Sequence, residues 1–157
     1  VKSGGGSGLG GKMEVDDKRK LSAPCGLPCF HCPARLAKDN VEIRKMIAKT
    51  LGIPEEKAQC DGCRLQMGNI TLISEGKTCK VYQCATEKKV EFCHECEEFP
   101  CDRFQPYADK ANFPHNTKLY QLCMMKKLGF KRWSEEEAAK IWDNYNSEEF
   151  DFEKILY

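Results

Sequence analysis

The sequence is poor in histidine and tryptophan, with three and two among 157 residues, and it has no long apolar run. No stretch approaches the ~20 consecutive apolar residues of a membrane-spanning helix, which excludes an integral membrane protein. No basic segment leads into an apolar one, so we do not expect secretion through a signal peptide. Charge of one sign is not in excess either, because the formal net charge is +1. Composition therefore gives no reason to expect nucleic acid or anionic lipid as a partner.

Glycine is concentrated at the start, where the first eleven residues hold six of the twelve glycines. Such a stretch buries too little apolar surface to offset the entropy lost on ordering it. We interpret residues 1–20 as a flexible Gly/Ser-rich tag or linker followed by a polar lead-in. Residues 21–157 are expected to form a single metal-binding domain, with a cysteine-rich part at 21–104 and a helical tail at 105–157.

Helix signals dominate the cysteine-rich part. Pro33 suits the first turn of a short helix, and Asp39 or Asn40 can cap a second helix that Gly52 ends. The apolar residues at 70–73 predict a short strand. The expected fold class is therefore a small α+β domain, mostly α, with irregular cysteine-rich loops, short helices and a C-terminal helical pair.

The tail predicts two helices. Residues 116–128 form the first, with Cys123 in its apolar face and Gly129 as its stop. Ser134 and Glu137 have the spacing of a capping box at the start of the second. The last apolar residues are expected to pack back onto the core; they are Phe150, Phe152, Ile155 and Leu156.

What the sequence has in abundance is cysteine, with eleven residues. Disulfides are typical of secreted proteins, whereas the C-x2-C spacing lets two thiolates face one point and is typical of metal sites. The two such pairs, and a C-x3-C-x2-C motif upstream, favour metal binding over buried apolar cysteines. The predicted ligands are Cys25, Cys29, Cys32, Cys60, Cys63, Cys79, Cys84, Cys93, Cys96 and Cys101.

Ten thiols exceed the eight that two four-cysteine sites would use. Either two sites leave two thiols spare, or one site is a cluster, or a histidine takes the place of a cysteine. His31 and His94 lie within the cysteine motifs, and we interpret them as hydrogen-bonding or exposed neighbours rather than ligands. The sequence does not tell which cysteines share a site.

The metal is left open between zinc and iron–sulfur. Cys60-Asp-Gly-Cys63 fits a zinc knuckle, whereas Cys32 followed by Pro33 is similar to the Cys-Pro element of ferredoxins. The C-x3-C-x2-C spacing also matches radical-SAM enzymes, but the chain is too short for a barrel of ~250 residues. About two zinc ions are slightly favoured, with a [4Fe–4S] cluster as the alternative.

Four motifs in order carry a family resemblance over residues 21–104: Cys25-Gly-Leu-Pro-Cys29-Phe-His-Cys32-Pro, Cys60-Asp-Gly-Cys63, Cys79-Lys-Val-Tyr-Gln-Cys84 and Cys93-His-Glu-Cys96-Glu-Glu-Phe-Pro-Cys101. Together they resemble the cysteine-rich domain-of-unknown-function family numbered 3795, found largely in anaerobic bacteria and archaea. The resemblance implies a small cytoplasmic metalloprotein of unestablished activity, and its anaerobic setting raises the weight of iron–sulfur. Lys89 stands where the family pattern has glycine, which affects the local backbone.

Three functions follow as hypotheses. The leading one is a zinc-stabilised binding or adaptor module with an unknown protein partner, because the sequence has no catalytic constellation and an enzyme is not favoured. The alternative is an iron–sulfur redox or electron-transfer protein, in which Cys25, Cys29 and Cys32 hold three irons. The third, nucleic-acid binding, is disfavoured by the neutral charge and depends on one basic and aromatic cluster: Lys126, Lys127, Phe130, Lys131, Arg132 and Trp133.

Overall fold

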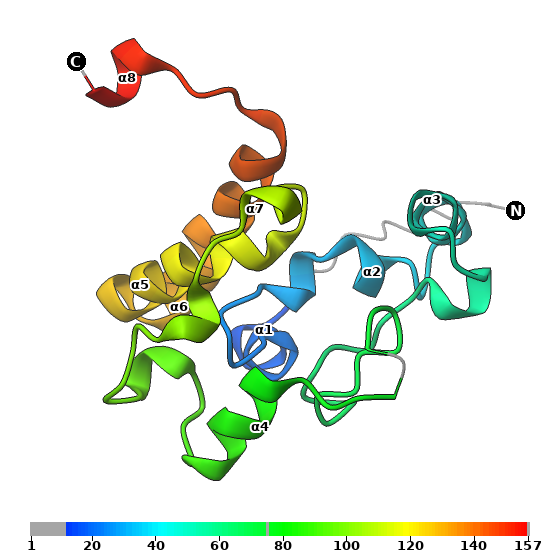
Figure 1. The fold of residues 1–157 in the computed structure, drawn as a ribbon, viewed down its shortest axis with the longest axis horizontal. Coiled ribbons are helices and arrows are strands. Elements are labelled where there is room, and N and C mark those ends of the chain that lie inside the picture. Colours follow the sequence, from blue (N-terminus) through cyan, green and yellow to red (C-terminus); the bar gives the residue numbers. More distant parts are fainter. Residues whose placement is uncertain (1–11, 75, 157) are drawn as a thin grey trace, which may run out of the picture.

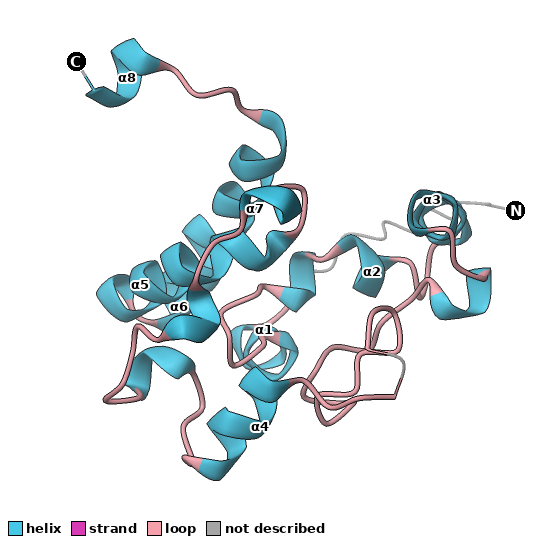
Figure 2. Cartoon of the chain, in the orientation of Figure 1, coloured by secondary structure: helices cyan, strands magenta, loops and turns pink. Residues whose placement is uncertain are grey.

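The computed structural model describes residues 12–74 and 76–156, and within these ranges the chain is built from helices and loops (Figures 1 and 2). No strand occurs among them, and only an isolated antiparallel bridge joins Ser22 to Pro28. The fold is therefore mostly helical, as expected, but its predicted β component is wrong. None of the helices described is long and apolar enough to cross a membrane.

The elements are short and follow one another closely along the chain. The helices are α1 (Val15–Leu21), α2 (Pro33–Leu36), α3 (Val41–Leu51), α4 (Lys80–Glu87), α5 (Lys118–Leu128), α6 (Phe130–Arg132), α7 (Ala138–Ser147) and α8 (Phe152–Leu156). Short 3-10 helices lie at Cys29–His31, Glu55–Lys57, Cys93–Glu95, Asp102–Phe104, Ala108–Lys110 and Pro114–Thr117, and a π-helical turn at Trp133–Glu137.

Local signals position α2, α3 and α5 as predicted. Pro33 occupies the first turn of α2. The Asn40 side chain accepts hydrogen bonds from two backbone N–H groups of α3, and Gly52 ends that helix with a φ of 65°. Helix α5 ends at Leu128, before Gly129, but starts at Lys118 because the preceding residues form a 3-10 turn that opens with Pro114.

The strand predicted at 70–73 is a turn instead. The N–H groups of Ile73 and Ser74 both donate to the carbonyl oxygen of Ile70, at 2.9 and 2.8 Å. The Ser74 hydroxyl also donates to the Asn69 side chain, at 3.1 Å. A lone strand has no ladder partner for its backbone groups, and the short polar side chains on either side satisfy a turn locally.

The folded part of the chain begins before residue 21, where the sequence analysis placed the start of the domain. The residues interpreted as a polar lead-in form α1, whose first turn is acidic and whose last turn is basic, an arrangement that complements the helix dipole. Val15 packs against the core, and Arg19 pairs with Glu91 at 2.7 Å. The interpretation of residues 1–11 as a flexible tag lies outside the described residues.

The core contains residues from both the cysteine-rich part and the tail. Its largest member, Trp133, is fully buried and donates from its indole nitrogen to the Gln121 side chain at 2.8 Å. Phe30 meets the Trp133 ring edge-on, with centroids 6.1 Å apart. Gly26 lies so close that a Cβ there would be 2.7 Å from Cγ of Leu122. The loop that starts the first cysteine motif is thus pressed onto α5.

Three expectations for the tail are wrong. Ser134 does not cap a helix, because residues 130–147 are continuously helical and its hydroxyl donates to the Lys131 carbonyl. Cys123 is exposed rather than in the core, since the inward side of α5 is formed by Gln121, Leu122 and Met125. The final apolar residues do not pack back, and all four are exposed.

Candidate metal centre

A first group of thiols surrounds Cys29. Burial raises the pKa of its thiol well above the ordinary value, and repulsion from the neighbouring thiolates raises it further. Burial, and then repulsion from Cys25, Cys79 and Cys60, raises the pKa of Cys63 to about 12. The first group is defined as Cys29, Cys32, Cys60 and Cys63, so the structure brings together the two motifs that the sequence left 28 residues apart.

Backbone N–H groups face the sulfur atoms of this first group. Cys32 precedes α2, and N–H groups of Ala34 and Arg35 hydrogen-bond to its sulfur, opposing the rise that burial causes in its pKa. The Gly62 N–H lies 3.3 Å from Sγ of Cys60. The Cys60 N–H donates to the Ala34 carbonyl at 2.9 Å, which ties the two motifs to each other. Such N–H groups stabilise negative charge on sulfur.

The second group of thiols lines a cavity of about 640 Å³. Burial, and then repulsion from neighbouring cysteines that include all three other members, raises the pKa of Cys93 to about 12. The rest of the cavity wall is mixed: apolar residues such as Phe99 and Phe104 lie beside four charged ones, which are Lys88, Glu98, Asp102 and Arg103. The second group is defined as Cys84, Cys93, Cys96 and Cys101.

Two predicted ligands fall outside these groups of four. Cys25 is buried and interacts with thiols of both groups, because it raises the pKa of Cys29 and of Cys93. Cys79 lies near Cys63, whereas its sequence neighbour Cys84 faces the second group. Cys25 therefore lies near members of both groups, and Cys79 near a member of the first.

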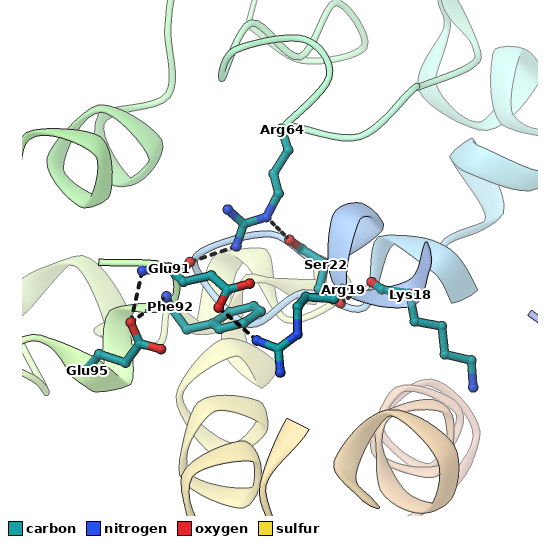
Figure 3. A network of polar contacts seen from close by, with 7 residues as sticks. All are labelled: Lys18, Arg19, Ser22, Arg64, Glu91, Phe92 and Glu95. Carbon is teal, nitrogen blue, oxygen red and sulfur yellow. Dashed lines mark hydrogen bonds and ion pairs between the residues drawn. The ribbon is translucent and has the colours of Figure 1, made fainter. Parts of the chain in front are cut away.

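Arg64 joins three cysteine-bearing segments, a role that the sequence did not indicate (Figure 3). Its guanidinium donates to the carbonyl oxygens of Ser22 and Glu91, both at 2.7 Å, and lies 5.1 Å from the centroid of the Phe92 ring. Ser22 precedes the first motif, Glu91 precedes the last, and Arg64 follows Cys63 directly. Only arginine has a planar fork of donors that can hold two such carbonyls at once.

We expect R64A to lower the free energy of unfolding by about 2–4 kcal/mol, because a charged donor to each of two carbonyls is lost. R64K should recover only part of this loss, since an ammonium group cannot span both acceptors. The measurement is the urea midpoint of each variant. R44A is the matched control, because among the described residues the Arg44 side chain makes one hydrogen bond, to Gln59 at 3.3 Å. Equal midpoints for R64A and R44A would contradict the role of Arg64.

The histidines make contacts of their own. His31 lies 2.9 Å from Asp143 of α7, and His94 stacks on Phe92 with ring centroids 6.0 Å apart. Burial lowers the pKa of His94, which favours its neutral form. His115 lies 2.9 Å from the Gln105 carbonyl. These contacts fit the interpretation of His31 and His94 as neighbours of the cysteines.

Two of the four basic residues of the basic and aromatic cluster are paired with glutamates of their own helical segment. Lys131 pairs with Glu135 at 2.5 Å and Arg132 with Glu136 at 2.8 Å. The aromatic members, Phe130 and Trp133, are buried, so they offer no face for stacking nucleic-acid bases.

All eleven cysteines are free. Within residues 12–74 and 76–156, no three histidine, cysteine, aspartate or glutamate side chains converge in the geometry that would hold a metal ion.

Comparison with known proteins identifies one family. The chain matches the family described as "Protein of unknown function (DUF3795)" over residues 21–106, more than half of its length. The matched segment contains every cysteine of both groups together with Arg64. No curated protein and no solved structure matches the chain.

Proposed function

We propose that this protein, which belongs to the DUF3795 family, is a metal-binding module with two four-cysteine zinc centres that acts as a binding or adaptor protein. The observation that carries the proposal is the gathering of thiols at two places, around Cys29 and at the cavity beside Cys93. Cys29, Cys32, Cys60 and Cys63 hold one ion, and Cys84, Cys93, Cys96 and Cys101 hold the other.

The donor set fits zinc. Four thiolates around one ion form a common structural zinc site. Burial, and then repulsion from neighbouring thiolates, raises the pKa of Cys29, Cys63 and Cys93. A bound dication stabilises the thiolate form against both effects. The N–H groups that face Cys32 and Cys60 stabilise the thiolates. Each group of four cysteines would supply four thiolates to one zinc ion.

Zinc bound in this way has a structural role. Four protein thiolates fill the tetrahedral shell and leave no position for a substrate. Each centre contributes folding free energy of order 10 kcal/mol, which is more than the short helices of the cysteine-rich part supply by themselves. Free thiols in such number suit a reducing compartment such as the cytoplasm. The function is then to present a surface to a partner protein.

Metal analysis of protein purified without oxygen tests the proposal. We expect about two zinc ions per chain and no visible absorption band. Protein that carries no metal, and that folds equally well with and without added zinc, would overturn it. Because zinc adds to the folding free energy, the melting temperature should also fall when a strong chelator is added.

A second candidate function is supported by the cavity at the second group. Its volume of about 640 Å³ exceeds what a single ion with thiolates at about 2.3 Å requires, and its four cysteines can also bind an iron–sulfur cluster. The protein would then carry electrons rather than only a structural metal. Iron and sulfide in the same preparation, with a broad band near ~400 nm, would favour this candidate.

A further inference from the structure

The last part of the chain carries an uncovered apolar face. Residues 148–156 form an arm that extends beyond the end of α7 and away from α5 (Figure 1). The rings of Phe150 and Phe152 pack edge to face, with centroids 5.0 Å apart. Ile155 and Leu156 follow at helical spacing, which places them on the same side as Phe152. All four side chains are between 58% and 62% exposed.

The arm is also acidic. Four carboxylates stand against one lysine in residues 148–156, and that lysine, Lys154, already pairs with Glu148 at 3.6 Å. Glu149, Asp151 and Glu153 remain as negative groups beside the apolar face. A surface that binds the arm should therefore be both apolar and basic.

Helix α5 offers such a surface on its outer side. It contains three lysines and no acidic residue. Tyr120, 58% exposed, and Lys127 lie two turns apart on the same side, with Lys126 beside them, and all three are exposed. In the described part of the chain, neither Lys126 nor Lys127 forms an ion pair. Lys131 and Arg132 differ, because glutamates of their own helix pair with them.

We propose that the arm of one copy docks on the outer side of α5 in a second copy, and that the exchange is reciprocal. A two-fold dimer makes the contact twice. Reciprocal exchange buries the four apolar side chains of both arms together with both docking surfaces, which brings the contact nearer to the ~1,200 Å² of a specific interface than one arm alone. The proposal does not depend on the metal centres.

The test is the mass of the full-length protein in solution, measured by sedimentation over a range of concentrations. We expect a monomer–dimer equilibrium. F150S/F152S should be monomeric, because the apolar contact is lost. M46S is the matched control, since Met46 is 56% exposed on α3, away from both surfaces, and should dimerise like the unmodified protein.

Charge reversal tests the orientation of the contact. K126E/K127E should raise the dimer dissociation constant by about tenfold or more, because two attractions in each interface become repulsions. E149K/E153K should weaken the dimer similarly, and the two sets combined should restore it. The proposal is overturned if the protein is monomeric at every concentration, as it would be with the arm docked on its own chain. It is equally overturned if a dimer persists in F150S/F152S, or if the combined variant does not recover.

Discussion

C93S is expected to unfold the cysteine-rich loops around the second centre and to lower the melting temperature sharply, while the first centre keeps its ion. Serine has nearly the same size as cysteine but does not replace a thiolate ligand for zinc, so the second centre loses one of four ligands. A structural site contributes of order 10 kcal/mol, which is comparable with the whole stability of a domain, about 5–15 kcal/mol. The measurement is far-ultraviolet circular dichroism during thermal unfolding of the zinc-loaded protein.

The matched control is C123S. Cys123 is exposed on α5 and lies outside both groups, so its replacement should leave the melting temperature unchanged. If C93S melted together with C123S and the unmodified protein, the second centre would contribute nothing to folding. The zinc proposal for that centre would then be wrong.

W133A is expected to be the most damaging substitution away from the cysteines. Trp133 is fully buried, and its loss leaves a cavity that costs about 3–5 kcal/mol. Gln121 is also fully buried and loses its hydrogen-bond donor, which adds about 1–3 kcal/mol. Because Phe30 packs against the indole ring, the loop between Cys29 and Cys32 loses its support as well.

Chemical denaturation of W133A, W133F and M46A measures this effect. W133F keeps an aromatic ring but no N–H donor, so it should fall between the other two variants. M46A removes an exposed side chain and should stay within about 0.5 kcal/mol of the unmodified protein. A W133A midpoint near that of M46A would show that the core does not depend on the indole.

The sequence correctly predicted those features that depend only on residues close together along the chain. The cap at Asn40, the stop at Gly52 and the first-turn proline of α2 all involve neighbours along the chain. The strand at 70–73 failed because a strand needs a distant partner that the sequence does not reveal. The capping box predicted at Ser134 was also wrong. Ser134 is buried within a helical turn and does not stand at the start of a helix.

Which cysteine motifs lie side by side depends on contacts between distant residues, and the spacing of cysteines along the sequence does not reveal those contacts. The hydrogen bond from Cys60 N–H to the Ala34 carbonyl joins two motifs, and Arg64 joins three segments. Neither contact has a signal in the sequence, because each is formed between residues far apart along the chain. One departure was visible beforehand: Lys89 stands where the family pattern has glycine, and it adopts a φ of 56°, a conformation that favours glycine.

The central claim is that two separate groups of cysteines each bind their own metal. The most direct measurement is the number of metal ions per chain in three double variants, purified without oxygen beside the unmodified protein. We predict one ion for C60S/C63S, one for C93S/C96S, and two for C25S/C79S. Loss of all metal from both of the first two variants, with neither able to bind one ion when refolded with zinc, would contradict two independent centres. A loss in C25S/C79S equal to that in the others would contradict the assignment of the ligands.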